Sequence, residues 1–172
     1  MKEIKFYGRG GQGIVTAGEI TAKCCLLEGK YAQFIPTFGP ERRGGPSICS
    51  LRISDEPILL KCNVGKADVA CVFDRTIWKF LDIGLKEDGI AIFNSAKKIS
   101  NFEKKSYIVD ATDIAIRILG RNITNTTMLG AFSKVTGLIK IDTLINVLKE
   151  MFDDKAEKNI ECALEAYNKV EE

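Results

Sequence analysis

The glycine-rich stretch Gly8–Gly13 is the feature of this sequence that most constrains its fold. It contains four glycines in six residues, with a short apolar run before it and a helical pattern over residues 14–28 after it. Its spacing matches G-x-G-x-x-G between a predicted strand and a predicted helix, the context that this motif requires. The residues that we expect to form an anion-binding turn are Gly8, Gly10, Gly11, Gln12 and Gly13.

This turn has a functional interpretation and a purely structural one. Glycine permits a positive φ in a tight turn, the approach of a phosphate to the backbone, and close packing of a helix on a strand. The first amides of the following helix lack intrahelical partners and lie at the positive end of the helix dipole, so they form an anion site. The structural alternative is that the glycines only permit a sharp connection, although four of them are more than such a connection needs.

A dinucleotide-binding fold also asks for an acidic residue at the end of the second strand, which holds the ribose hydroxyls. The predicted second strand, residues 30–35, ends without a carboxylate, and Glu28 lies on the helix side of the connection. This argues against NAD as a ligand. A free-standing Rossmann-like protein that binds NADP or FAD remains an alternative, with Arg42 or Arg43 on the 2′-phosphate of NADP.

The chain is predicted to form a single domain over residues 1–172. Its length is usual for one domain, and 45% hydrophobic with 28% charged residues is an ordinary globular balance. The net charge of +2 and the scattered basic pairs argue against a nucleic-acid surface. The first residues show no apolar leader and no run is long enough to span a bilayer, so we expect no membrane association and a cytoplasmic location.

The cysteines and the missing histidines restrict the chemistry of the chain. The six cysteines include no C-x-x-C pair, which argues against a zinc ribbon or an iron–sulfur cluster. We expect reduced thiols that pack as small hydrophobes. Histidine, the commonest general base and metal ligand, does not occur in the sequence. We therefore expect no catalytic residue and no metal ligand here.

The apolar runs predict an α/β fold with a doubly wound, mainly parallel sheet, an inserted antiparallel hairpin and a helical C-terminal third. Alternation from residue 47 predicts a hairpin over residues 47–62, with a half-buried first strand and a returning strand at Ile58–Leu60. Thr124 or Asn125, and Asp142, are predicted helix N-caps. The other predicted strands lie at 4–7, 31–35, 69–73, 89–93 and 106–109, and the predicted helices at 14–28, 76–80, 111–119, 125–136, 142–152 and 154–170.

Residues 36–46, here called the arginine loop, hold three of the four prolines and three glycines. This composition excludes a helix or a central strand. A loop of this length in a compact domain is more often functional than not, and Arg42 and Arg43 lie at its middle, although a plain surface connection is the alternative. We expect the loop, the glycine turn and Asp74 to meet at the carboxyl ends of the parallel strands, where such sheets bind ligands.

These motifs resemble the gamma subunit of the 2-oxoacid:ferredoxin oxidoreductases, the family of pyruvate, 2-oxoisovalerate and 2-oxoglutarate synthases. The resemblance covers most of the chain, in the family's order. It implies an α/β domain inside a larger enzyme that converts a 2-oxoacid and coenzyme A to an acyl-CoA and CO2 and reduces ferredoxin. The form of the arginine loop favours pyruvate. The matching segments are Gly8–Gly13, Phe38–Gly44, Arg52–Asp55 with Pro57–Ile58, and Asn125–Ala131.

The resemblance also implies where the cofactors lie. Thiamine diphosphate, Mg and the 4Fe-4S clusters belong to partner subunits, the alpha, beta and ferredoxin-like chains, and ferredoxin is the electron acceptor. No cofactor is expected to bind firmly to this chain, and the isolated chain is expected to be inactive. Coenzyme A is the suggested ligand; a purely structural role, with the arginines paired to carboxylates of a partner, is the alternative. The implied coenzyme A site consists of Gly8, Gly10, Gly11, Gln12, Gly13, Arg42, Arg43, Gly44 and Asn125.

Overall fold

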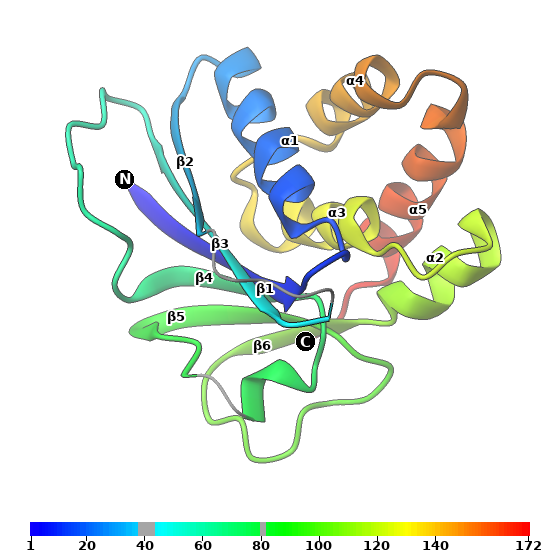
Figure 1. Ribbon diagram of the computed structural model, residues 1–172, viewed down its shortest axis with the longest axis horizontal. Helices are drawn as coiled ribbons and strands as arrows, with labels where there is room; N and C mark the ends of the chain where they lie inside the picture. Colours follow the sequence, from blue (N-terminus) through cyan, green and yellow to red (C-terminus); the bar gives the residue numbers. More distant parts are fainter. Residues whose placement is uncertain (38–43, 80–81) are drawn as a thin grey trace.

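The structure, a computed structural model, describes residues 1–37, 44–79 and 82–172. Its centre is a six-stranded sheet in the order β2-β3-β1-β4-β5-β6 (Figure 1). β3 runs antiparallel to β1 and β2, whereas β1, β4, β5 and β6 pair in parallel. The predicted α/β class with a mainly parallel sheet is confirmed. The strands are β1 Lys2–Arg9, β2 Tyr31–Thr37, β3 Pro46–Ser54, β4 Ala67–Val72, β5 Leu85–Asn94 and β6 Ser106–Val109.

The C-terminal third is helical, as predicted. Thr124 is the N-cap of α3, but its side chain makes no capping hydrogen bond. The predicted N-cap of α4, Asp142, is wrong, because Lys140 is the N-cap. Asp142 lies instead in the first turn of α4, where its charge favours the helix dipole. The helices are α1 Ile14–Leu27, α2 Ala111–Leu119, α3 Asn125–Thr136, α4 Ile141–Phe152 and α5 Ala156–Lys169, with short 3-10 helices η1 Ile77–Lys79 and η2 Asp153–Lys155.

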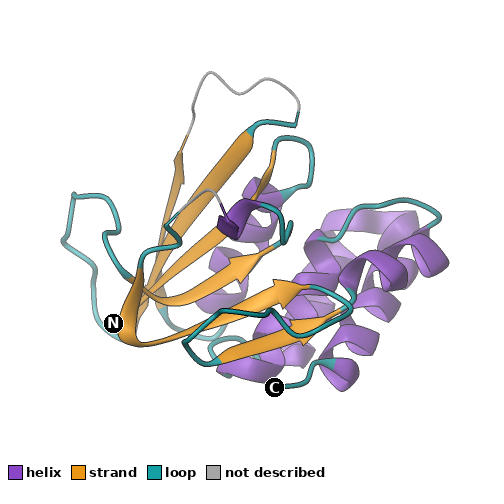
Figure 2. Cartoon of the chain, turned by 90° about the horizontal axis from the view of Figure 1, so that it is seen from below, coloured by secondary structure: helices purple, strands orange, loops and turns teal. Residues whose placement is uncertain are grey.

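The two faces of the sheet are covered by different kinds of structure (Figures 1 and 2). Helices α1 to α5 contribute to one large apolar cluster, in which Phe6 of β1 packs edge-on against Phe132 of α3 with 5.7 Å between ring centroids. On the opposite face, Trp78 of η1 and Phe102 of the loop before β6 pack on Phe93 of β5. The second covering layer is therefore made of turns and loops rather than of long helices.

The antiparallel hairpin differs from the prediction. β3 pairs with β2 and β1, and residues 58–60 form no strand. Residues 60–62 instead contact side chains of β2 and β3. Leu60 O accepts from Gln33 Nε2 and Cys62 O accepts from Arg52 Nη1, both at 2.8 Å. Arg52 is only 1% exposed, and a buried guanidinium requires such acceptors. β3, which was expected to be half-buried, is thus covered on both faces.

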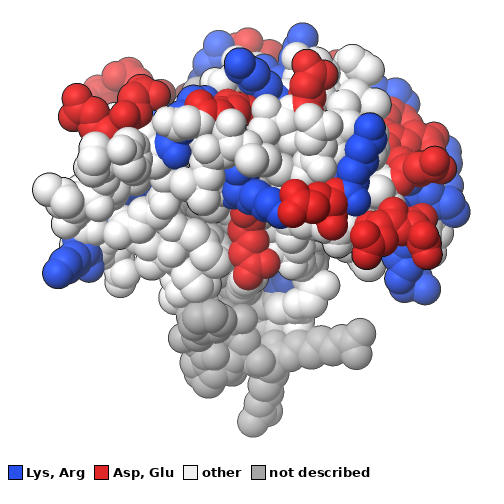
Figure 3. Space-filling view, turned by 90° about the horizontal axis from the view of Figure 1, so that it is seen from above, with Lys and Arg blue, Asp and Glu red and all other residues white. Residues whose placement is uncertain are grey.

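Charged side chains of both signs are interspersed on the face of the molecule that Figure 3 shows. This face therefore has no extended patch of one sign of the kind that binds nucleic acid. In the part of the chain that the structure describes, no helix has the length and apolar character needed to cross a membrane.

Helices α3 and α5 approach closely because residue 130 has no side chain. A Cβ atom at Gly130 would lie 1.9 Å from the carbonyl oxygen of Ala163 in the middle of α5. Both residues are buried. The contact between the two helix backbones therefore fixes their separation, since larger residues at the contact push packed helices apart.

The end of α1 is tied to the start of α4 by Glu28. One carboxylate oxygen accepts from the Lys140 backbone N–H at 2.6 Å, and the other pairs with Lys30 Nζ at 3.0 Å. Burial alone would raise the pKa of Glu28, but the hydrogen bonds from Lys140 and Lys30 outweigh burial and hold the pKa below its ordinary value of 4.5. Glu28 is therefore ionised at neutral pH and stabilises the junction of the two helices.

We predict that Gly130→Ala lowers the free energy of unfolding by about 1–3 kcal/mol, because the added methyl group must displace the backbone of α5. Urea unfolding of the purified chain measures the change. Gly65→Ala is the matched control, since a Cβ there meets no atom within 4 Å. Equal stability of Gly130→Ala and the parent would show that the two helices separate without cost.

We predict that Glu28→Gln lowers the free energy of unfolding at pH 7 by about 1.5–3 kcal/mol, the value of hydrogen bonds to a charged group. Because the pKa of folded Glu28 is lowered, its contribution is complete above the ordinary value of 4.5 and is lost as the pH falls through the folded value. The difference between parent and variant should therefore shrink as the medium becomes acidic. In the control Glu150→Gln, the removed charge is 65% exposed and the change should be small at every pH. A constant difference for Glu28→Gln would contradict an ionised Glu28.

Candidate functional site

The carboxyl edge of the sheet joins three segments that are distant in the sequence. The Gly10 N–H donates to Gly45 O at 2.9 Å, and the Gly44 N–H donates to Gly10 O at 3.2 Å, which ties the glycine turn to the end of the arginine loop. Asp74, directly after β4, contacts Arg9 of the turn. The predicted meeting of these segments is confirmed for the part of the loop that the structure describes.

Arg9 makes the side-chain contacts of this junction. Its Nε donates to Asp74 Oδ2 at 2.8 Å, its Nη1 to Gly44 O at 3.0 Å, and its Nη2 to Thr76 Oγ1 at 2.8 Å. The other oxygen of Asp74 accepts from the Thr76 hydroxyl at 2.6 Å and the Thr76 N–H at 2.9 Å. Burial would raise the pKa of Asp74, but hydrogen bonds from Thr76 and Arg9 outweigh burial and lower it. Asp74 is therefore ionised at neutral pH.

The glycines of the turn have identifiable structural roles. A Cβ at Gly8 would lie 2.7 Å from Ile14 Cγ2, so Gly8 lets α1 start close to β1. Gly11 and Gly13 have φ values of 95° and 74°, which favour glycine. Gln12 closes the turn, because its Oε1 accepts from the Arg9 N–H at 2.8 Å. These contacts and φ values account for Gly8, Gly11 and Gly13 without a ligand. The backbone N–H and carbonyl of Gly10 both form hydrogen bonds to residues 44–45.

The first turns of α1 and α3 meet at this edge (Figure 1). Gly13, the N-cap of α1, packs so closely against Asn125, the first residue of α3, that a Cβ at Gly13 would lie 2.7 Å from Asn125 Nδ2. Neither first turn contains an acidic residue, and the side chain of Thr124, the N-cap of α3, makes no capping hydrogen bond. Within α3, Asn125 Oδ1 accepts from the Thr126 N–H at 2.9 Å. Two helix N-termini therefore lie close together without a carboxylate in either first turn.

A polar hollow of about 360 Å³ lies beside the turn, at the ends of β4, β5 and β6. Asn94 in its wall is held rigidly, since its Nδ2 donates to Phe73 O and to Thr112 Oγ1, both at 2.9 Å. Asp74 and Asp110 also line the hollow. Arg75 lies in the same wall, so the hollow offers charged groups of both signs.

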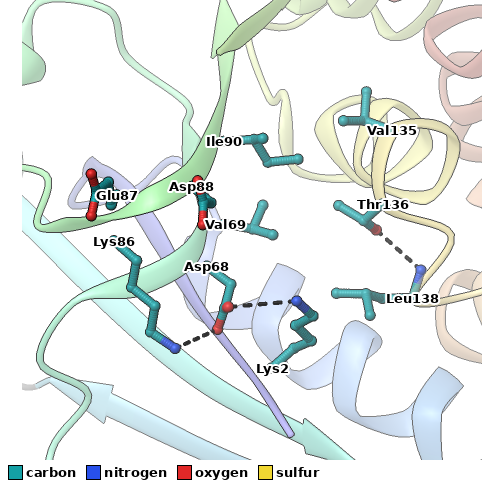
Figure 4. A pocket seen from close by; sticks show the side chains of 10 residues that line it. All are labelled: Lys2, Asp68, Val69, Lys86, Glu87, Asp88, Ile90, Val135, Thr136 and Leu138. Atoms are coloured by element: carbon teal, nitrogen blue, oxygen red, sulfur yellow. Dashed lines mark hydrogen bonds and ion pairs between the residues drawn. The ribbon is translucent and has the colours of Figure 1, made fainter. Parts of the chain in front are cut away.

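A larger hollow of about 520 Å³ lies at the opposite, amino edge of the sheet (Figure 4). Lys2 and Lys86 both point to Asp68, with N–O distances of 3.6 and 2.8 Å. Glu3 extends the cluster, because its Oε1 pairs with Nε of the buried Arg52 at 3.1 Å. These charges neutralise one another, so we assign this cluster a structural role and place the candidate site at the carboxyl edge.

The buried cysteines do not take part in the site. Among the residues that the structure describes, Cys62 is exposed and the other cysteines are buried. Burial raises the pKa of Cys24 and of Cys49 to about 12, so these thiols stay protonated and pack as hydrophobes. Over residues 1–37, 44–79 and 82–172, no three His, Cys, Asp or Glu side chains are grouped so that they could hold a metal ion.

Most of the predicted site residues come together. The turn Gly8–Gly13, Gly44 and Asn125 lie at the same edge, and Gly44 has a φ of 91°. Arg42 and Arg43 fall outside the described residues. Arg9 belongs to this edge but was not predicted as a site residue, although an arginine inside a glycine turn and an aspartate directly after a predicted buried strand were visible signals in the sequence.

The comparisons with known proteins agree with the motifs. Residues 3–169 match the family model described as pyruvate ferredoxin/flavodoxin oxidoreductase. The chain is 49% identical to pyruvate synthase subunit PorC of Methanothermobacter marburgensis, over 99% of this chain and 98% of the relative. It is 46% identical to the common gamma subunit of the pyruvate/ketoisovalerate oxidoreductases of Pyrococcus furiosus, over 99% of this chain and 98% of that one.

Solved structures show the same fold. The pyruvate oxidoreductase subunit PORC of Thermotoga maritima matches with a TM-score of 0.87 and 35% identity, over 99% of this chain and 98% of that one. The 2-oxoglutarate:ferredoxin oxidoreductase of Magnetococcus marinus, solved with 2-oxoglutarate, coenzyme A and succinyl-CoA bound, matches with a TM-score of 0.80 and 26% identity. That match covers 98% of this chain but 30% of the longer one. The chain therefore belongs to the pyruvate ferredoxin/flavodoxin oxidoreductase family, as a gamma-type subunit of a 2-oxoacid:ferredoxin oxidoreductase.

Proposed function

We propose that this gamma subunit holds phosphate groups of coenzyme A at the carboxyl edge of its sheet. The observation that carries the proposal is the meeting of the first turns of α1 and α3 at Gly13 and Asn125, with no acidic residue in either turn. Backbone N–H groups at the positive end of a helix bind phosphate oxygens. The diphosphate and the 3′-phosphate of coenzyme A are ligands of this kind.

In this role the chain supplies binding and orientation rather than chemistry. The complete enzyme converts a 2-oxoacid and coenzyme A to an acyl-CoA and CO2 and reduces ferredoxin. We assign thiamine diphosphate, Mg and the 4Fe-4S clusters to the alpha, beta and ferredoxin-like partner subunits, and we expect the isolated chain to be inactive. The names of the relatives, a pyruvate synthase subunit and a pyruvate/ketoisovalerate oxidoreductase subunit, favour pyruvate as the 2-oxoacid.

Two other roles were open from the sequence. A role in assembly, with Arg42 and Arg43 on carboxylates of a partner subunit, remains compatible with the fold and requires its own test. The free-standing NADP- or FAD-binding protein has no support, since the chain matches oxidoreductase subunits over nearly its whole length.

We predict that Thr16→Glu in the first turn of α1 raises the KM for coenzyme A of the reconstituted complex about tenfold, because a carboxylate there repels phosphate (about 1.4 kcal/mol). The same change should stabilise α1 by about 0.3–1 kcal/mol through the helix dipole. Opposite effects on binding and stability are therefore expected. Thr16→Gln, of equal size but neutral, is the control and should leave the KM near the parent value. A parent-like KM for Thr16→Glu would contradict phosphate binding at this helix end.

We predict that Arg42→Ala and Arg43→Ala separate coenzyme A placement from assembly. If these arginines bind phosphate, each change should raise the KM for coenzyme A about tenfold or more, since a charge-assisted contact contributes roughly 1.5–3 kcal/mol. Subunit association, measured by size-exclusion chromatography, should stay unchanged. If they bind a partner, the variants should leave the complex instead. Parent-like kinetics together with parent-like assembly would mean that both arginines are only solvated.

A further inference from the structure

We propose that Arg9 is a positioning residue, which holds the glycine turn in its binding shape and does not itself bind the phosphate. The proposal rests on the proposed function of the carboxyl edge. An arginine inside a glycine turn suggests a phosphate ligand, because a guanidinium matches phosphate geometry. The hydrogen bonds of Arg9 to the protein indicate instead that it positions the turn.

Three of the five N–H donors of the Arg9 guanidinium bind the protein. Its Nε, Nη1 and Nη2 donate to Asp74, Gly44 and Thr76, at distances of 2.8, 3.0 and 2.8 Å. The charge of the guanidinium is paired with the Asp74 carboxylate, which is only 19% exposed. Since this charge is already compensated, Arg9 adds little attraction for an anion.

These contacts fix three segments relative to one another. Arg9 ends β1, Gly44 belongs to the end of the arginine loop, and Asp74 follows β4. The backbone of Arg9 is also held, because Gln12 Oε1 accepts from its N–H at 2.8 Å and the Gln12 N–H donates to its carbonyl at 3.0 Å. The next residue, Gly10, bonds to Gly45 and Gly44. Arg9 thus fixes the chain immediately before the first amides of α1.

A turn that is fixed before the ligand arrives binds it without an ordering cost. Without Arg9, the turn would sample other shapes and the amides of α1 would point to the ligand for only part of the time. Lysine cannot replace arginine here, because one ammonium group cannot reach three acceptors in different directions. A charge-preserving variant therefore distinguishes positioning from direct binding.

The experiment compares Arg9→Lys and Arg9→Ala in the reconstituted enzyme. Both should raise the KM for coenzyme A about tenfold and to the same extent, while the KM for the 2-oxoacid stays at the parent value. In the full chain, hydrogen exchange of the amides of Gly10 and Gly44 should become faster. Arg117→Lys is the matched control, since Arg117 also pairs with carboxylates, Asp113 and Glu165, but on α2 and α5.

Three results would overturn the proposal. A parent-like KM for Arg9→Lys with a raised KM for Arg9→Ala would mean that the charge of Arg9 is sufficient, as expected of a direct phosphate ligand. A raised KM without faster exchange at Gly10 and Gly44 would remove the link between Arg9 and the shape of the turn. A parent-like KM for both Arg9 variants would remove the positioning role. In that case Thr16→Glu shows which idea has failed: if it still raises the KM, only the positioning role is lost, and if it does not, coenzyme A placement is lost as well.

Discussion

The contact between Gly13 and Asn125 is the constraint on which the carboxyl edge depends. Any side chain at Gly13 would strike Asn125, and the residue also has a φ of 74°, so only glycine lets the first turns of α1 and α3 meet. Neither helix has an acidic residue in its first turn, and in α3 the Asn125 Oδ1 accepts from the Thr126 N–H. No carboxylate of either first turn therefore neutralises the positive ends of these two helices.

The two edges of the sheet use charge in different ways. At the amino edge, Lys2, Lys86 and Asp68 pair with one another, and Glu3 reaches the buried Arg52. Charges that satisfy one another in this way offer little to a ligand, although breaking one such pair inside a protein is costly. At the carboxyl edge we propose that backbone amides supply the attraction for a phosphate, and that the ion pair of Arg9 and Asp74 shapes the turn.

The sequence predicts local structure well and long-range pairing poorly. The limits of α2, α3 and β6 follow from periodicity and turn residues, and the predicted strand-turn-helix context of Gly8–Gly13 is confirmed. The place of β3 between β2 and β1 could not be predicted, because which strands pair is decided by contacts between distant segments. The burial of Arg52 follows from that place, since its acceptors come from residues 3, 33 and 62. The contact between Arg9 and Asp74 could not be predicted for the same reason, because Asp74 becomes a neighbour of Arg9 only when β4 pairs with β1.

A phosphate site built from the backbone amides of the first turn of α1 would have a particular dependence on pH. An amide N–H does not titrate, and the sequence contains no histidine that could change its charge near neutral pH. The protein side of the site therefore keeps the same charge as the medium becomes more acidic or more basic around neutrality. If coenzyme A binds there, any acid–base sensitivity of binding in that range comes from the ligand, whose 3′-phosphate, a monoester, gains a proton at a pH of about 6. The subunit would then sense the ionisation of its ligand and not that of its own residues.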